Sequence, residues 1–419
     1  MLNRTLLFLL SIVFITNITV AQESNDSNIR DAAIKVFVDC YKCDEDFIRR
    51  EIPYVNYVRD RKEADVHILV TTESTGSGGT EYQINYLGQG DYEGIKDRVF
   101  YISNADDTNE TRREGRTNMM ALGLMQFVSK TPLAGKIKIS YDNNGQEKVQ
   151  EEIVVDKWNS WVFDTDMSLD YDQQETYVNP DVETDFRIEK VTPDWKVEIA
   201  AGYDYTLRKY IYEDTVYQSV RNNATFRHLL VKSLGNHWSV GGRIYVNSDT
   251  YQNRGFAWSL YPAVEYNVFP YYESSQKQFR FQYRIGYGYN YYTEETIYNK
   301  MEEGLFGQSL SVAYEMRQPW GSINTSLSGF NYLYDFSKNN VQLRSWIYIR
   351  LLKGLSLSLS GSARFIHDQL SLPKSDATAE EVLLRQRQLA TNYSYNLKIG
   401  FSYTFGSIYN NVVNPRFGD

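Results

Sequence analysis

The chain has 419 residues and a formal net charge of -9, which disfavours nucleic acid as a partner because a phosphate backbone attracts Lys and Arg. Aromatic residues make up 15% of the chain, and no run of about 20 apolar residues occurs that would form a transmembrane helix. With 2 Cys and 4 His, the sequence lacks the ligand spacing of a common zinc site, and neither a metal nor a cofactor is expected.

Residues 1–21 predict a secretory signal peptide. Arg4 precedes the apolar stretch Leu6–Ile15, and the small residue Ala21 stands where a signal peptidase cleaves. We therefore expect an exported mature chain.

Residues 30–130 predict a small α+β domain in the periplasm. Asp107 and Glu110 have the spacing of a helix capping box, and apolar residues then recur at helical intervals up to Val128. A domain of about 100 residues can bury its own core. The expected elements before that helix are a strand Lys35–Asp39, a helix Cys43–Glu51, and strands Val66–Thr72, Glu81–Leu87 and Arg98–Ser103.

Cys40 and Cys43 form a Cys-x-x-Cys pair between the first strand and the first helix. A thiolate at a helix N-terminus is stabilised by the helix dipole, so thiol–disulfide exchange is one interpretation. An exported protein meets an oxidising compartment, where two nearby cysteines usually form a structural disulfide. We favour the structural disulfide, and the redox state stays open at this point.

Residues 131–157 are charged and lose helical periodicity, and Asn143-Asn144-Gly145 is a strong turn signal. This segment is expected to be a linker or a β-hairpin, with strands over Lys136–Tyr141 and Glu147–Val155 in the second case.

Residues 158–409 alternate between apolar and polar side chains over long stretches. From Phe279 to Tyr291 every second residue is apolar or aromatic, and the residues between them are polar or Gly. Such strands fit a transmembrane antiparallel β-barrel of about 12 strands, whereas a soluble sandwich usually has strands of about five or six residues. The expected strands are 158–171, 182–191, 195–207, 217–232, 238–248, 256–269, 278–291, 306–317, 320–334, 341–352, 355–367 and 389–405.

The connections alternate in length, which orients the barrel. Thr192–Asp194 and Lys353–Gly354 are short, as periplasmic turns are, while Tyr292–Leu305 and Asp368–Gln388 are long, as outer loops are. The first strand then runs outward, and both ends of the barrel segment lie in the periplasm.

Charged residues of both signs fall on the face predicted to line the lumen. Two interpretations stay open, a network of salt bridges that fills the lumen or a narrow selective pore, because unpaired buried charges are costly. The predicted lumen charges are Asp164, Asp166, Asp170, Arg187, Glu198, Asp204, Arg243, Glu265, Arg280, Arg284, Glu315, Arg344, Arg350 and Arg364.

The last strand carries the outward aromatics Phe401, Tyr403 and Phe405, a pattern similar to the signal that the barrel-insertion machinery reads. Residues 410–419 follow as a periplasmic tail. We therefore expect the insertion machinery and outer-membrane lipids as partners.

The run Trp158–Phe163, the strand Asp65–Thr72 with its Gly-rich hairpin, and the tail Gly406–Asn411 resemble an uncharacterised group of Bacteroidota outer-membrane β-barrel proteins. In that group a small periplasmic domain precedes the barrel. The resemblance implies location and architecture, and no chemistry, because the function of the group is unassigned.

The sequence predicts an outer-membrane protein of a Gram-negative bacterium, not an enzyme, with a structural or envelope-interaction role. Its N-terminal domain would dock on a periplasmic protein or the cell wall. The alternatives are a narrow channel for small solutes or ions and an outer-membrane lipid-modifying enzyme. For the enzyme, His367 beside Asp368 is the one suspicious pair, and no catalytic motif supports it.

Overall fold

The computed structural model describes residues 33–41, 43–76, 78–138, 157–213, 215–375, 388–413 and 416. The predicted signal peptide and most of the predicted linker or hairpin lie outside these residues. Within the predicted linker, residues Ala134–Lys136 form a 3-10 turn.

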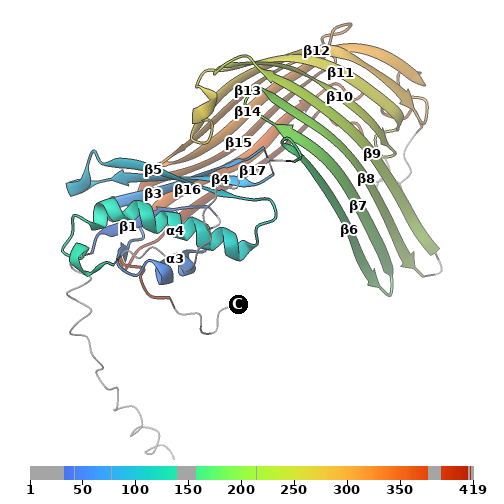
Figure 1. Ribbon diagram of the computed structural model, residues 1–419. Coiled ribbons are helices and arrows are strands. Elements are labelled where there is room, and N and C mark those ends of the chain that lie inside the picture. Colours follow the sequence, from blue (N-terminus) through green and yellow to red (C-terminus); the bar gives the residue numbers. More distant parts are fainter. Residues whose placement is uncertain are drawn as a thin grey trace, which may run out of the picture.

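The N-terminal elements form a five-stranded mixed sheet in the order β2-β1-β3-β4-β5 (Figure 1). β1 pairs in parallel with β2 and β3, whereas β3, β4 and β5 pair antiparallel. The strands are β1 (Lys35–Asp39), β2 (Asn56–Tyr57), β3 (Val66–Ser74), β4 (Thr80–Gly88) and β5 (Lys96–Ser103), and the helices are α3 (Glu45–Glu51) and α4 (Asn109–Val128).

Two local predictions in this domain need correction. α4 is capped by Thr108, whose side chain accepts a hydrogen bond from the Thr111 amide, and not by Asp107. Asp107 instead accepts from the Asn104 amide and closes the turn before the helix. β2 was not predicted, because two residues are too short to show strand periodicity.

The core of the small domain lies between its sheet and α4. Strand alternation sends Val66, Ile68 and Ile84 to one face, where they are buried against Leu124 and Phe127 of the helix. This packing uses only one face of the sheet. The other face carries polar side chains.

The rest of the chain forms a 12-stranded antiparallel sheet in which each strand pairs with the next along the sequence. Its strands are β6 (Trp161–Gln174), β7 (Tyr177–Val191), β8 (Trp195–Tyr212), β9 (Thr215–Ser233), β10 (Trp238–Asp249), β11 (Arg254–Asn267), β12 (Lys277–Tyr292), β13 (Glu302–Gln318), β14 (Gly321–Tyr332), β15 (Asn339–Leu352), β16 (Leu355–Ile366) and β17 (Tyr393–Tyr403).

Each predicted strand of this sheet is present, and the clearest differences are at the strand ends that the prediction placed on the outer side. β7 begins at Tyr177 rather than near residue 182, although Asn179-Pro180 reads as a turn. Pro180 lies opposite Tyr171, and Tyr177 lies opposite both Gln174 and Tyr210. Ladder pairing on both sides therefore extends the strand past a local turn signal.

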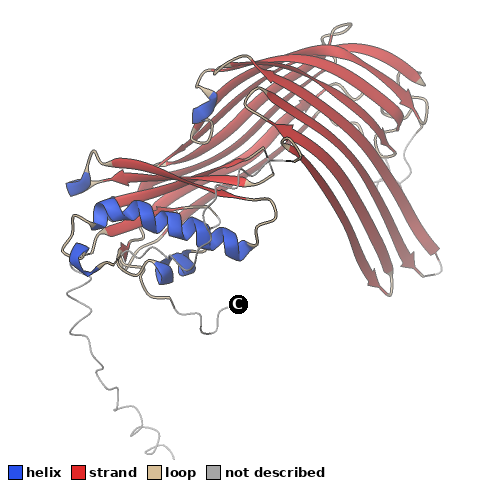
Figure 2. Ribbon diagram, viewed as in Figure 1, coloured by secondary structure: helices blue, strands red, loops and turns tan. Residues whose placement is uncertain are grey.

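The sheet is strongly curved but open (Figure 2). Its two edge strands, β6 and β17, do not pair with each other among the described residues, so the predicted closure into a barrel is not shown. None of the described helices combines the length and the apolar character needed to cross a membrane.

One face of the 12-stranded sheet is apolar and exposed. Register places Phe281, Val312 and Leu327 side by side on this face across three strands, and Ile347 continues it on β15. Large exposed apolar side chains also occur on both edge strands, such as Leu169 on β6 and Leu397 on β17. This face packs on no other layer of the described chain.

Candidate functional site at the mouth of the sheet

The polar face of the small sheet lies against one end of the 12-stranded sheet (Figure 1). Alternation in β3 and β4 places His67, Thr71 and Gln83 on this face, all of them buried. The end of the 12-stranded sheet that they face carries the turn between β11 and β12 and the ends of β15 and β16. We call this contact the mouth interface.

Asp39 and Arg350 form the central contact of the mouth interface. Arg350 Nη1 and Nη2 donate to Asp39 Oδ2 and Oδ1 at 2.7 and 2.8 Å, a bidentate pair whose side chains are each 20% exposed. The buried His67 Nε2 lies 3.3 Å from Asp39 Oδ2. The Arg350 guanidinium also sits over the rings of Phe37 and Tyr348, at 5.4 and 5.3 Å from their centroids.

The Asp39 carboxyl stays ionised in this setting. Burial works to raise its pKa, but the hydrogen bonds and charges of His67 and Arg350 outweigh burial and hold the pKa below its usual 3.8. The pair therefore acts as a charged link between the two sheets at neutral pH.

A second group of contacts joins β3 and β4 to the turn between β11 and β12. The Ser274 hydroxyl donates to Glu73, and the Ser275 hydroxyl donates to Gln83 Oε1 at 2.9 Å. Gln276 Nε2 donates to Asn85 Oδ1 at 3.0 Å. This turn contains the short 3-10 helix Tyr271–Glu273, and the three residues that follow the helix form the docking surface for the small domain.

The hairpin tip between β3 and β4 reaches the other side of the mouth. A Cβ atom on Gly76 would come within 2.4 Å of the Val191 carbonyl oxygen at the end of β7, and one on Gly78 would lie 3.3 Å from Val162 on β6. The small sheet thus extends from β15 to β6 and β7. It lies across the mouth of the curved sheet.

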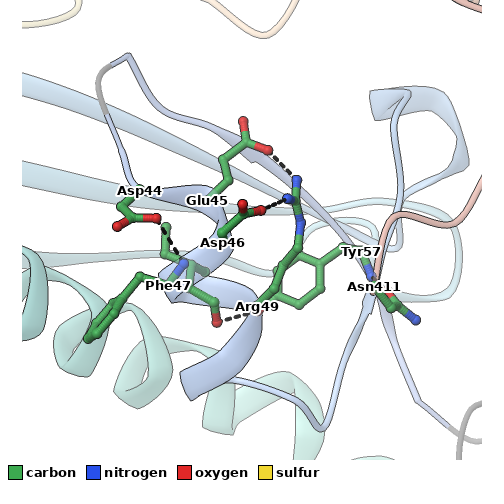
Figure 3. A network of polar contacts seen from close by, with 8 residues as sticks. Asp44, Glu45, Asp46, Phe47, Arg49, Tyr57 and Asn411 are labelled. Atoms are coloured by element: carbon green, nitrogen blue, oxygen red, sulfur yellow. Dashed lines mark hydrogen bonds and ion pairs between the residues drawn. The ribbon is translucent and has the colours of Figure 1, made fainter. Parts of the chain in front are cut away.

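The C-terminal tail ties the two sheets together a third time. Val58 and Tyr409 form an antiparallel bridge, and the Arg59 amide donates to the Ile408 carbonyl at 3.1 Å. Asn411 Oδ1 accepts from the Tyr57 amide at 2.6 Å (Figure 3). Asn411 of the predicted tail and the two residues Ile408 and Tyr409 before that tail therefore dock at the β2 edge of the small sheet through an isolated β-bridge and hydrogen bonds.

Most of the predicted lumen charges do not pair with one another. Arg280 and Glu315 form an ion pair at 3.2 Å, and Arg350 binds Asp39 of the small domain instead of a lumen carboxylate. Asp164 stands directly opposite Arg187 in the ladder, but no ion pair joins them in the described structure. A continuous network of salt bridges, one of the two interpretations left open by the sequence, is therefore not seen among the described residues.

Three further residues of the predicted lumen set form hydrogen bonds with neutral side chains. Glu265 accepts from Tyr271 and Gln282, Asp204 accepts from Asn223, and Arg364 donates to Asn340. These carboxylates and guanidiniums share the polar face with Asp166, Glu198, Arg243, Arg284 and Arg344, as the ladder pairs require. These residues therefore share one polar face of the sheet, and most of them form no ion pair with one another in the described structure.

The aromatic residues predicted as an insertion signal lie on the apolar face at the β17 edge. Phe401 and Tyr403 lie opposite Leu357 and Leu355 of β16, and Phe405 follows the end of the strand with its ring stacked on Tyr403 at 5.4 Å. All three are largely exposed.

Cys40 and Cys43 are joined by a disulfide, with their Cα atoms 5.5 Å apart. The disulfide follows Asp39 directly and precedes Asp44, which caps α3 by accepting from the Phe47 amide. It therefore closes the turn next to the mouth interface.

Sequence reasoning missed Asp39, His67 and the docking role of Asn411. Alternation in β1 and β3 did place Asp39 and His67 off the core face, but nothing local showed what covers that face. No family model matches the chain, and no curated protein is significantly similar to it.

Proposed function

We propose that this protein is an outer-membrane β-barrel whose N-terminal domain lies in the periplasm and covers the mouth of the barrel, with a structural or envelope-interaction role. The observation that carries the proposal is the exposed apolar face of the 12-stranded sheet.

An apolar face of this extent must be covered by an apolar environment. Soluble monomers rarely expose contiguous apolar patches above a few hundred Å². Trp258, Leu260 and Leu310 are exposed at mid-sheet, whereas the small domain buries its apolar residues fully in a core. Acyl chains would cover the exposed face, and the polar inner face would meet water, as in membrane barrels.

Closure of the sheet by β6 and β17 completes the proposal. An even number of antiparallel strands brings the first and last strands into antiparallel alignment, and pairing would remove two exposed edges. Leu169 on one edge and Leu397 on the other both belong to the apolar face, so closure keeps that face continuous.

Heat-modifiable electrophoresis and membrane fractionation test the proposal on the full chain. A closed barrel in mild detergent should migrate faster before boiling than after it, and the protein should fractionate with the outer membrane. A chain that stays in solution without detergent would refute the membrane assignment.

In the envelope-interaction role, the partner would contact the helical face of the small domain, because the polar face of its sheet is occupied by the mouth interface. Leu122 on α4 is 58% exposed, whereas Thr71 is buried against the mouth. A photo-crosslinking residue at position 122 should capture one periplasmic protein or the cell wall in intact cells, and the same residue at position 71 should not. Capture of no partner at position 122 would count against this role.

A gated anion channel is the second candidate, and one observation favours it. Arg243 and Arg284 face the same inner surface and repel each other, and neither makes an ion pair within the described residues. In planar bilayers, Arg350→Ala should then raise anion conductance by loosening the domain that covers the mouth. Arg284→Ala should conduct anions less well than the wild type, because it loses one of these two arginines. Absence of conductance in both the wild type and Arg350→Ala would rule out the channel.

A further inference from the structure

A cavity of about 470 Å³ lies beside the mouth interface, between the segment after β2 and the ends of β15, β16 and β17. The small domain lines it with Arg59, Asp60, Arg61 and Lys62. The large sheet lines it with residues that include Leu352, Leu355 and Thr404, and the C-terminal tail adds Asn410.

The cavity has a surplus of positive charge. Two of its cations are engaged elsewhere: Arg49 pairs with Glu45 and Asp46 (Figure 3), and Arg350 pairs with Asp39. Arg59, Arg61 and Lys62 form no ion pair with any carboxylate of the described chain. Three cations side by side in a chain of net charge -9 are therefore available to an anion.

Asp60 lies in the same segment, but it forms no ion pair with these cations in the described structure. Its Oδ1 accepts from the Lys62 amide at 2.9 Å, and its Oδ2 accepts from the Gly354 amide at 2.6 Å. The Arg59 amide is bound to the Ile408 carbonyl. The cationic segment is thus held by both the tail and the turn between β15 and β16, so the site is preorganised.

The other side of the cavity leads to the apolar face. Leu352 lies opposite Leu355, and Leu355 lies opposite Tyr403, so these side chains begin the apolar surface at this end of the strands. A ligand with an anionic head and an apolar tail would meet both surfaces at once.

We propose that this cavity binds the phosphate-bearing headgroup of an anionic membrane lipid, with Arg59, Arg61 and Lys62 contacting the phosphate and Leu352 and Leu355 contacting the start of the acyl chains. The inference rests on the proposed membrane location, because that location places this rim at the periplasmic leaflet. Guanidinium and ammonium groups are suited to phosphate oxygens.

Calorimetric titration of the full chain in non-ionic detergent tests the site. The probes are dihexanoyl phosphatidylglycerol, dihexanoyl phosphatidylcholine and inorganic phosphate. The phosphatidylglycerol should bind, and the Arg59→Gln/Arg61→Gln/Lys62→Gln variant should bind it roughly a hundredfold more weakly. The matched control Lys130→Gln/Lys136→Gln/Lys138→Gln removes the same charge from exposed positions outside the cavity and should bind like the wild type.

Equal binding of both lipids, or an unchanged affinity in the cavity variant, would overturn the proposal. Inorganic phosphate binding without phosphatidylglycerol would overturn the lipid as ligand and identify a free anion instead. If the triple variant does not fold, Arg61→Gln alone should still weaken binding about fivefold.

The titration needs no membrane, so it is independent of fractionation. A soluble wild-type chain that still binds phosphatidylglycerol would refute the membrane assignment and leave the site standing. An outer-membrane protein that binds no lipid here would do the reverse.

Discussion

Replacing Arg350 with Ala should loosen the small domain from the mouth without unfolding either sheet. The change removes two charged hydrogen bonds to Asp39 and leaves this mostly buried carboxylate with His67 as its remaining side-chain partner. Exposed ion pairs contribute about 0–1 kcal/mol, and removing one partner of a fully buried pair costs about 3–5 kcal/mol. Since both side chains are 20% exposed, we expect a loss of about 2 kcal/mol, or roughly 30-fold in the docking equilibrium.

Amide hydrogen exchange in detergent measures this loss directly. The Gly354 amide donates a hydrogen bond from the large sheet to Asp60, and the amides of Arg59 and Asn410 donate to Ile408 and Tyr57 in the contact of the small domain with the C-terminal tail. Their protection should fall about 30-fold in the variant, because exchange through undocking reports the open population.

Two comparisons make the result specific. Amides inside the small sheet, such as that of Ile84, should keep their protection in Arg350→Ala. The Arg344→Ala variant should leave the protection of all three reporter amides unchanged, because Arg344 is on the same strand but has no contact with the small domain in the described structure. A double-mutant cycle with Asp39→Ala separates the pair energy from the cost of an orphaned charge. Wild-type protection at the reporters in Arg350→Ala would refute the reasoning.

Three further outcomes are expected. Because docking lowers the pKa of Asp39, the contribution of Asp39 to docking stability is present above the ordinary pKa of 3.8 and is lost as the pH falls below it. Protection at the reporter amides should therefore decline in acid for the wild type but not for Asp39→Asn. Asn411→Ala removes two hydrogen bonds between the tail and β2 and should lower that protection by about 1–2 kcal/mol, whereas protection that stays unchanged would show that the tail is dispensable. In Gly123→Ala the new methyl group would meet the Tyr86 ring at 2.3 Å, so calorimetry should show the small domain destabilised by about 1–3 kcal/mol. Gly135→Ala is the neutral control, because nothing lies within 4 Å of a Cβ atom at that position.

The local pattern of the sequence was sufficient to predict the long strands. A side-chain period of two is a property of each strand alone, so the alternation from Phe279 to Tyr291 marked β12 without knowledge of its neighbours. Turn residues then separated the strands, and the apolar helical face that contains Leu124 and Phe127 marked α4. The pattern also placed the charged residues on one face of the large sheet.

Only the tertiary structure decided what those faces meet. Asp39 and Arg350 are 311 residues apart in the chain, and their pairing depends on where the small sheet docks. The tail residue Asn411 finds its partner in β2, a two-residue strand with no periodicity to read. Alternation determines which face of its sheet a residue lies on. It does not determine which distant surface packs against that face, because that depends on how the two sheets come together in space.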